Sequence, residues 1–335
     1  KPFQKSVPKN PKPKGLAAFD VLVKEAIDLK LKGAVTVVEH CQEEYVSSYF
    51  AVPKPHRENQ FRPILNLKYF NDFVKKYPFN MESLKSVKDW IRPGYFCASL
   101  DIKDAFLHIS IHKSSRKYLR FNWLGELLEW CSLVFGLTSS PRVITKVLKP
   151  VISFIRTHFG ILISIYIDDI LIQSISFEKC IRDTQVVILV LLCLGWSVKW
   201  EKCSLIPSQK FVHLGFLFDT AAMSLTCPVD KVERIKKMCY EILVSGSSTV
   251  LGLEKLLGTL ESVRPAVPLA VLHFRYLQKQ LLLSKKSDRI ASKVNLFPRN
   301  PLRSSLGGSR SSCSTAQLQS GSQSRQFKFT RTQTF

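Results

Sequence analysis

The chain has 335 residues, 45% of them hydrophobic, and its 49 Lys and Arg against 26 Asp and Glu give a formal net charge of +23 at pH 7. This length predicts two or three packed units, and so large a basic excess favours a polyanionic partner, of which nucleic acid is the first candidate. Nine cysteines without a Cys-x-x-Cys pair argue against a zinc site and a disulfide-stapled secreted domain, and they favour a reducing compartment.

Neither a membrane span nor a secretory signal is expected. The longest uncharged run, 186–198, is shorter than the roughly 18 residues that a membrane helix needs. Residues 1–15 are rich in Lys and Pro and have no apolar core of the kind that a signal peptide requires. We therefore expect a cytoplasmic protein without a membrane partner, with nuclear access open.

The N-terminal part is expected to form an arm and a basic, strand-rich lobe. Residues 1–15 hold five Lys and no acidic residue, which predicts a disordered or extended arm or a merely solvated tail. Apolar residues recur at helical spacing over 16–32, with Gly33 as the expected stop. The segments 45–55 and 61–71 are expected to be strands on either side of a polar turn.

The middle of the chain alternates strands and helices in the order β-α-β-β-α-β. That order is typical of a ferredoxin-like sheet with two helices on one face, and its connections place the first strand beside the central hairpin. The first helix is expected to begin at Pro141 and to kink at Pro150. The expected strands are 96–102, two within 160–175, and 196–206, and the expected helices are 141–159 and 177–195.

The C-terminal part divides into a short strand pair, helices and a tail. Residues 210–219 predict a further hairpin, and 228–283 predict two or more amphipathic helices. From about residue 284 the hydrophobic period disappears, and the Ser-rich sequence that follows cannot build a core.

Two adjacent carboxylates interrupt one of the most apolar stretches, "ISIYIDDILI" at 163–172. The expected topology places Asp168 and Asp169 next to Asp101, which ends the first strand in "LDIKDAF". Carboxylates gathered in this way repel one another unless cations lie among them, and oxygen ligands select a hard ion such as Mg²⁺. Two such ions support nucleotidyl transfer. The alternative is that the Asp pair only forms a tolerated turn, and Asp104 is expected to cap or solvate the turn after the strand.

The motifs taken together resemble a known family. "YIDD" between apolar strands, "LDIKDAF" and "FGLTSSP" are similar to the polymerase core of reverse transcriptases. Three further segments are most similar in sequence to the DIRS-like, tyrosine-recombinase group of retrotransposons: "FAVPKP", "FRPILNLKYFN" and "LGWSVKWEKCSLIPSQKFVHLGF". The resemblance covers about 16–283 in the expected order, although Val134 stands where the family commonly has Pro and Asn66 where it commonly has an acid.

The resemblance implies an α+β right-hand polymerase with fingers, a ferredoxin-like palm, a helical thumb and disordered tails. Family members continue into an RNase H domain with an acidic cluster, whereas no acidic residue follows Asp288, so RNase H is expected to be absent. The implied divisions are a basic arm (1–15), fingers (16–95), palm (96–122), a fingers–palm junction (123–145), more palm (146–224), thumb (225–283) and a low-complexity tail (284–335).

The resemblance also assigns the catalytic centre. Asp101 and Asp168, with the backbone carbonyl of Ile102, match the ligands of two Mg²⁺ ions, for which Mn²⁺ is a substitute. Asp169 matches the second, less directly engaged aspartate. Tyr166 matches an aromatic residue near the primer terminus, although it is equally well read as a buried strand residue.

Phe106 matches the aromatic steric gate of the family. A ring beneath the sugar would collide with a ribose 2′-hydroxyl and admit deoxyribose, so it favours DNA synthesis and disfavours an RNA-dependent RNA polymerase. The alternative is an ordinary core Phe.

Lys54 and Arg62 match the basic pair that binds the triphosphate in the family, a role that suits both cations. Taken alone, each would be interpreted as a charged surface residue.

Three further matches concern the loop, the leaving group and the primer. Gly136 lies in the loop that meets template and nucleotide, where the plain alternative is a helix start capped by Ser139 or Ser140. Lys202 matches a general acid for pyrophosphate, with Lys199 as an alternative. The primer grip matches His213, Leu214 and Gly215 within "FVHLGF".

The sequence therefore predicts an RNA-directed DNA polymerase of a retroelement. Its expected partners are an RNA template, a DNA or RNA primer-template duplex and dNTPs, and the oligomeric state is left open. The alternative function is a decayed relic that keeps the fold and only binds nucleic acid. The intact Asp101, Asp168, Asp169 and Arg62 count against that alternative.

Overall fold

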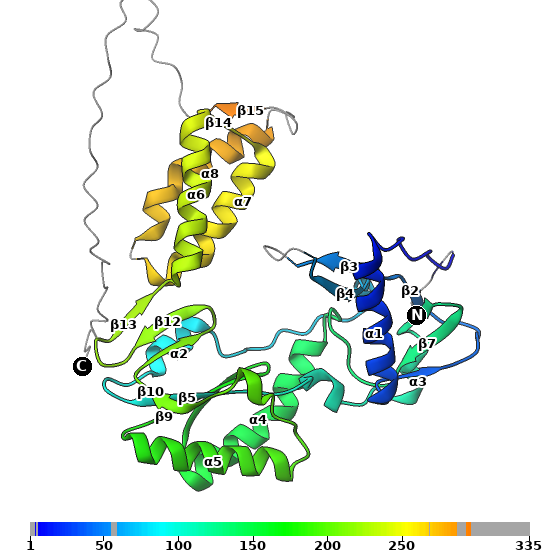
Figure 1. Cartoon of the computed structure of the whole chain (residues 1–335), viewed down its shortest axis with the longest axis horizontal. Coiled ribbons are helices and arrows are strands. Elements are labelled where there is room, and N and C mark those ends of the chain that lie inside the picture. Colours follow the sequence, from blue (N-terminus) through cyan, green and yellow to red (C-terminus); the bar gives the residue numbers. More distant parts are fainter. Residues whose placement is uncertain (1–3, 5, 55–58, 268, 287–292, 296–335) are drawn as a thin grey trace, which may run out of the picture. The chain divides into compact units, whose positions relative to one another are not determined.

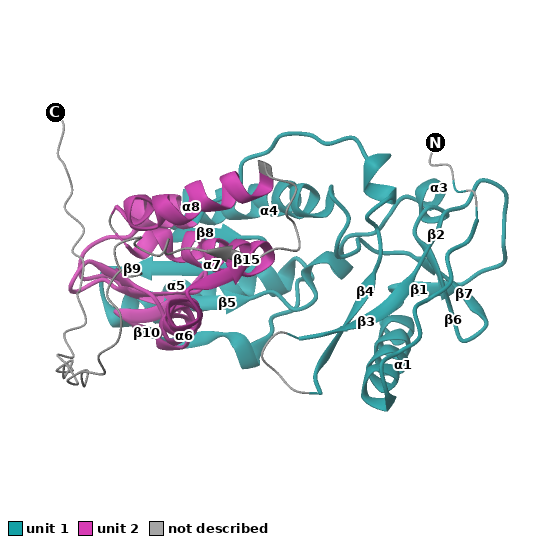
Figure 2. Cartoon of the chain, turned by 90° about the horizontal axis from the view of Figure 1, so that it is seen from above, with its two compact units in different colours: residues 1–83, 98–207 teal, residues 84–97, 208–335 magenta. Residues whose placement is uncertain are grey.

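The computed structural model describes residues 4, 6–54, 59–267, 269–286 and 293–295 (Figure 1). The chain divides into two compact units, each built from two separate stretches (Figure 2). Unit 1 comprises residues 1–83 and 98–207, and unit 2 comprises residues 84–97 and 208–335. The described part of the expected N-terminal arm has no helix or strand, as predicted for an extended segment.

Unit 1 contains a strand-rich lobe with one long helix. Helix α1 (Leu16–Leu31) packs on a β-hairpin, and Gly33 follows it with a φ of 65°, which confirms the expected stop. The hairpin consists of β3 (Tyr49–Pro53) and β4 (Phe61–Leu65), which lie within the expected segments, although the second strand ends at Leu65 and not at residue 71. A separate four-stranded sheet has the order β1-β7-β6-β2, with strands Val35–Val37, Glu126–Trp130, Arg120–Trp123 and Val46–Ser47.

A buried ion-pair cluster holds this sheet together around Arg120, whose side chain is only 7% exposed. The guanidinium contacts Glu44 at 2.5 Å and Glu129 at 2.6 Å, and it also donates to the carbonyl of Glu39 at 3.2 Å. Glu44 and Glu129 lie on different segments of the lobe, and Arg120 supplies the buried positive charge that both share, although Glu44 also contacts His40 at 2.5 Å.

Replacing Arg120 with Ala is expected to lower the free energy of unfolding by about 3–5 kcal/mol, because both carboxylates would lose their buried counter-charge. Lys117→Ala is the matched control, since Lys117 forms a more exposed pair with Glu43 at 3.6 Å. The control should cost less than about 1 kcal/mol. Urea denaturation of the two variants measures both values, and similar losses would contradict the role assigned to Arg120.

The second part of unit 1 is a four-stranded sheet of order β10-β5-β9-β8. The first strand in sequence, β5 (Phe96–Asp101), lies between β10 and β9, which confirms the ferredoxin-like arrangement. Figure 1 shows the two crossover helices on one side of the sheet, with α4 packed on β8 and α5 on β9. The remaining bounds are β8 Leu162–Tyr166, β9 Asp169–Ser174, β10 Ser204–Ser208, α4 Ser140–Phe159 and α5 Phe177–Cys193.

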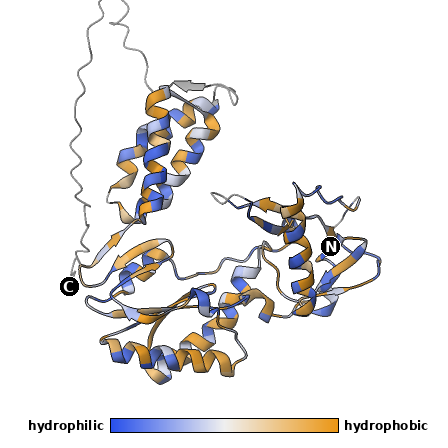
Figure 3. Cartoon of the chain, in the orientation of Figure 1, coloured by the Kyte–Doolittle hydropathy of each residue, from blue (hydrophilic) through white to orange (hydrophobic). Residues whose placement is uncertain are grey.

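The core of this sheet is strongly apolar. Ile163, Ile170 and Ile172 of the central hairpin are fully buried, together with Ile144 of α4 and Val187 of α5. Figure 3 shows the corresponding strands and helix α5 as largely hydrophobic. The short connections of unit 1 are the helical turns Phe70–Asp72, Ala105–His108 and Trp200–Lys202 and helix α3 (Lys113–Arg116).

Two local expectations for this sheet were wrong. The segment expected as a strand from residue 196 instead bends through the turn Trp200–Lys202 before β10 begins, and the turn is closed by the N–H of Lys202, which donates to the carbonyl of Lys199 at 3.0 Å. Neither Ser139 nor Ser140 caps α4 with its side chain. Ser140 Oγ donates instead to the carbonyl of Val134 at 2.7 Å.

Unit 2 contains the predicted hairpin of residues 210–219, which a third strand that was not predicted extends into a meander, and the predicted helices. Helices α6 and α7 match the expected amphipathic segments, and a core of Leu253, Leu257 and Phe274 joins α7 to α8. Its elements are α2 Leu84–Trp90, β11 Lys210–His213, β12 Phe216–Asp219, β13 Ser224–Thr226, α6 Val229–Ser245, β14 Ser247–Thr249, α7 Val250–Val263, the turn Arg264–Ala266, α8 Ala270–Lys286 and β15 Lys293–Asn295.

The tail expected from residue 284 begins as regular structure. Helix α8 continues to Lys286, and β15 pairs antiparallel with β14. The rest of the expected tail, including the part on which the missing RNase H was argued, lies outside the described residues. No helix among the described residues is both long enough and apolar enough to cross a membrane.

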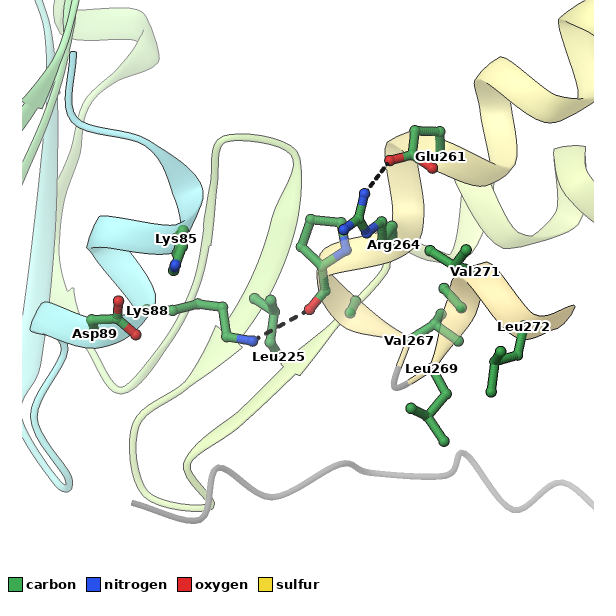
Figure 4. Close-up of a pocket in the computed structure, with 13 residues that line it drawn as sticks. Lys85, Lys88, Asp89, Leu225, Glu261, Arg264, Val267, Leu269, Val271 and Leu272 are labelled. Atoms are coloured by element: carbon green, nitrogen blue, oxygen red, sulfur yellow. Dashed lines mark hydrogen bonds and ion pairs between the residues drawn. The ribbon is translucent and has the colours of Figure 1, made fainter. Parts of the chain in front are cut away.

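A pocket of about 970 Å³ lies within unit 2 between α2 and the turn before α8 (Figure 4). Lys88 Nζ donates across it to the carbonyl of Pro265 at 3.4 Å, and Arg264 pairs with Glu261 at 2.7 Å. These contacts join the short stretch 84–97 to the C-terminal stretch of the same unit.

Candidate active site

The two acidic motifs meet at the end of the central hairpin of unit 1. Strand β5 ends at Asp101, and the backbone N–H of Ile102 donates to the carbonyl of Asp168 at 3.0 Å. Tyr166 and Asp169 face each other across the hairpin, so Ile167 and Asp168 form its two-residue turn. The expected juxtaposition of Asp101 with the Asp pair is therefore present in the fold.

The turn between the strands is strained. Ile167 has a φ of 60°, a left-handed conformation that favours glycine and is unusual for a β-branched residue. Such a backbone conformation raises the free energy of the fold by on the order of 1–3 kcal/mol and persists only where the surrounding structure holds it. The buried flanks of β8 and β9 supply that support, so the position of Asp168 is fixed by the apolar core of the hairpin.

The carboxylates crowd one another in a partly dry environment. Burial, together with the nearby charges of Asp168 and Asp101, raises the pKa of Asp169 to about 6. Burial also raises the pKa of Asp168, with Asp101 adding to the effect. Lys202 offsets part of this repulsion, because its Nζ lies 3.3 Å from Oδ2 of Asp101. The cluster keeps an excess of negative charge.

Asp169→Asn is expected to stabilise the metal-free protein at pH 7.5 by on the order of 1 kcal/mol, allowing for solvent screening of a half-exposed group. The folded pKa of about 6 lies above the unfolded value of 3.8, so ionisation of Asp169 destabilises the fold increasingly from pH 3.8 to about 6 and fully above that. The gain should shrink as the pH falls from 6 towards 4. Thermal melts in EDTA at several pH values measure it, and a gain that grows in acid would contradict the assignment.

The oxygen atoms of the site suit a hard cation whose remaining ligands come from water and substrate. Among the described residues, no three His, Cys, Asp or Glu side chains gather at the spacing of a preformed metal site. Mg²⁺ is ordinarily bound through one or two carboxylates, with water and substrate phosphates completing its shell. Asp101 and Asp168 with the nearby Ile102 backbone fit that mode of binding and do not form a closed cage.

Asp104 does not have the expected role. Its side chain makes no capping hydrogen bond, and it pairs instead with Lys32 at the end of α1, at 2.8 Å. Its φ of 48° turns the chain sharply after the catalytic strand. Lys32 and Asp104, with His108, also line a cavity of about 330 Å³. The ion pair therefore ties the turn that carries Phe106 to the strand-rich lobe.

Phe106 is 6% exposed and packs edge-to-face against Phe135, with ring centroids 4.6 Å apart. Phe135 itself is 59% exposed. Next to it, Gly136 has a φ of 88°, which a residue with a side chain would adopt only under strain. The candidate gate and the candidate nucleotide-binding loop are thus in direct contact through Phe135.

Asn71 holds this loop and was not recognised from the sequence. Its Nδ2 donates to the carbonyl of Gly136 at 2.9 Å, and its Oδ1 accepts from the N–H of Thr138 at 2.8 Å. The clue available in the sequence was only an Asn near the end of "NLKYFN", 65 residues before the loop.

Glu82 and Arg156 were also missed, and they cover the free edge of β8. Glu82 accepts from the N–H of Ile165 at 3.0 Å and from Ser164 Oγ, and it pairs with Arg156 at 2.6 Å. Arg156 Nε donates in turn to the carbonyl of Ile163 at 3.0 Å. This network fixes the strand that leads into the Asp turn.

The two candidate general acids differ in their contacts. Lys202 forms the ion pair with Asp101, whereas Lys199 influences Asp168 only through its charge. Cys203 adds a contact that the sequence did not indicate, because its Sγ accepts a hydrogen bond from the N–H of Asp101 at 3.4 Å. The segment 199–203 thus holds Asp101 from the β10 side.

The remaining candidates lie on two hairpins. Arg62 lies on β4 opposite Val52, and Lys54 follows β3, so both lie towards the tip of the β3–β4 hairpin. Within the described part of the chain, neither side chain bonds to the three carboxylates. The candidate primer grip belongs to unit 2, where Leu214 and Gly215 both have positive φ and form the turn between β11 and β12. His213 beside them is buried.

These features define a right-hand polymerase fold, and solved structures share it. The foamy viral protease-reverse transcriptase dRH in complex with double-stranded DNA has a TM-score of 0.67 at 21% identity, covering 83% of this chain and 46% of that chain. The foamy viral protein in complex with an RNA/DNA hybrid has a TM-score of 0.66 at 19% identity, covering 89% and 37%.

The sequence comparisons identify the domain more narrowly. The family model for reverse transcriptase (RNA-dependent DNA polymerase) matches residues 52–218, so this part of the chain is similar to reverse transcriptases. The Gag-Pol polyprotein of Walleye dermal sarcoma virus is 26% identical over 242 residues, which cover 72% of this chain and 13% of the polyprotein. That of Gibbon ape leukemia virus is 26% identical over 199 residues, covering 57% and 12%. The chain thus spans a small fraction of these relatives.

Proposed function

We propose that this chain is an RNA-directed DNA polymerase of a retroelement, which adds dNTPs to the 3′-hydroxyl of a primer. The observation that carries the proposal is the meeting of Asp101 with the strained Asp168 turn inside the part of the chain that is similar to reverse transcriptases. Carboxylates with raised pKa in a partly dry site are typical of functional positions.

Asp101, Asp168 and the carbonyl of Ile102 are the groups that we propose to hold two Mg²⁺ ions, with Mn²⁺ as a substitute. When bound, such ions activate a hydroxyl nucleophile and stabilise a leaving pyrophosphate. Asp169 adds negative charge without direct binding. Lys202, held beside Asp101, is suited to give a proton to the leaving pyrophosphate, and Lys199 is the alternative donor.

The remaining candidates would orient the substrates. Lys54 and Arg62 would bind the triphosphate, since ammonium and guanidinium groups suit phosphate oxygens. Phe106, braced by Phe135, would lie beneath the sugar and exclude a 2′-hydroxyl. The loop at Gly136 would meet the template and the incoming base. His213 with its neighbouring turn would hold the primer strand.

The proposed partners are an RNA template and a primer-template duplex. The similar foamy viral structures are complexes with double-stranded DNA and with an RNA/DNA hybrid, and the net charge of +23 suits a polyanion. We further propose a DIRS-like origin, which rests on the sequence of motifs such as "FRPILNLKYFN". We also propose that the protein is located in the cytoplasm and has access to the nucleus.

Primer extension tests the proposed function. The purified chain is given an RNA template, a labelled DNA primer, dNTPs and Mg²⁺, and elongation is expected in a salt-sensitive manner. A parallel anisotropy titration measures binding to the same duplex. Binding without any elongation, in Mg²⁺ and in Mn²⁺, would support a non-catalytic nucleic-acid-binding protein and reject the polymerase.

A further inference from the structure

The side chain of Gln4 attaches the N-terminal arm to the strand-rich lobe, because it makes the two backbone hydrogen bonds that a neighbouring strand would make. Gln4 Nε2 donates to the carbonyl of Val46 at 2.7 Å, and Gln4 Oε1 accepts from the N–H of the same residue at 2.9 Å. Val46 belongs to β2, which lies at the end of its sheet and, among the described strands, pairs with β6 alone. One primary amide thus satisfies both outward backbone groups of an edge residue.

A second amide fixes the arm six residues further on. Asn10 Nδ2 donates to the carbonyl of Asn122 on β6 at 2.5 Å, and its Oδ1 accepts from the N–H of Tyr49 on β3 at 2.8 Å. Asn10 therefore joins the arm to two strands that are remote in sequence. Pro8, Pro11 and Pro13 stiffen the backbone on either side because each fixes φ.

These anchors hold three lysines on the surface. Lys9, Lys12 and Lys14 are all exposed, and within the described residues none of them forms an ion pair. The first acidic residue of the chain is Asp20, so no carboxylate of the arm competes for them. Because the arm is already fixed, much of the entropy that a free tail would lose on binding is lost before the partner arrives.

We propose that this fixed arm, comprising residue 4 and residues 6–14, is a phosphate-binding element for the backbone of a nucleic acid. The choice of partner rests on the proposed function, and the shared chemistry is a run of phosphates from a single-stranded template overhang or from the primer-template duplex. The arm then extends the nucleic-acid surface to residues that lie before the matched domain, which begins at residue 52.

Salt-dependent fluorescence anisotropy tests the lysines. The triple variant Lys9→Gln, Lys12→Gln, Lys14→Gln is compared with a charge-matched control, Lys146→Gln, Lys149→Gln, Arg182→Gln, whose residues are exposed on α4 and α5. With a labelled single-stranded RNA, loss of three phosphate contacts should reduce the salt slope by about 2 and weaken binding by up to about a hundredfold at 0.1 M salt. Equal effects of both triple variants would overturn the proposal.

Two further comparisons separate the alternatives. Gln4→Ala with Asn10→Ala releases the arm but keeps its lysines, and we expect severalfold weaker binding with little change in salt slope. Unchanged affinity would show that the lysines act as a free tail and would reject a fixed element. Repeating the titrations with a blunt duplex and with an overhang identifies the strand that the arm contacts. Binding is measured without nucleotide, so the role of the arm in binding can be judged even if the chain does not extend primers.

Discussion

Asp168→Asn is expected to abolish primer extension, lowering the rate of dNTP incorporation on the order of a thousandfold or more. The substitution keeps the size of the side chain and its place in the turn, but it removes the charge that would hold the ion beside the primer terminus. Because the strained turn is supported by buried isoleucines, the fold should survive. Single-turnover extension in Mg²⁺ measures the effect.

Asp169→Asn is the matched control, because it removes the same charge one residue away. If the two neighbours are unequal as proposed, this variant should lose much less activity than Asp168→Asn. Both variants should bind the primer-template duplex as tightly as the unaltered chain. An Asp168→Asn protein that extends primers within about tenfold of the normal rate would exclude a metal ligand at this position.

Phe106→Val is expected to raise the use of ribonucleotides relative to deoxyribonucleotides by roughly ten- to a hundredfold, the usual scale of discrimination by pocket size. Removing the ring would open space where a 2′-hydroxyl would otherwise collide. The variant also loses the edge-to-face contact with Phe135, so a lower thermal stability is expected. Extension with single nucleotides of each kind measures the ratio.

Phe106→Tyr provides the control, since it keeps the ring and should keep the preference for deoxyribonucleotides. If valine left the ratio of ribonucleotide to deoxyribonucleotide use unchanged, Phe106 would be a core residue only, as its 6% exposure alone would suggest. Comparing the ratio for each protein, and not the absolute rate, removes the contribution of partial unfolding.

The elements near the carboxylates were predictable because their signals are local. Continuous apolar runs bounded by turn residues indicated β5, β8 and β9, and the order of elements was sufficient to place β5 beside the hairpin. The pairing of Asp101 with the Asp168 turn followed from that topology. The helices α4 to α7 followed from apolar residues at helical spacing.

The supporting contacts could not be predicted, since they join positions far apart in the chain. Asn71 meets Gly136 65 residues later, and Glu82 meets Arg156 74 residues later. Each looks like an ordinary polar residue in its own segment. Asp104 was misjudged for the same reason, because its partner Lys32 lies 72 residues away and no local pattern reveals it.

The covering of β8 by Glu82 and Arg156 also bears on how the protein behaves in solution. An uncovered edge strand offers unpaired N–H and C=O groups to any other extended chain, which is a route to aggregation. Here a carboxylate and a guanidinium occupy those groups at Ile165 and Ile163. The same pair that stabilises the strand before the Asp turn therefore also protects this edge from pairing with other chains. A fragment cut between residue 82 and residue 156 would expose the unpaired backbone groups of β8.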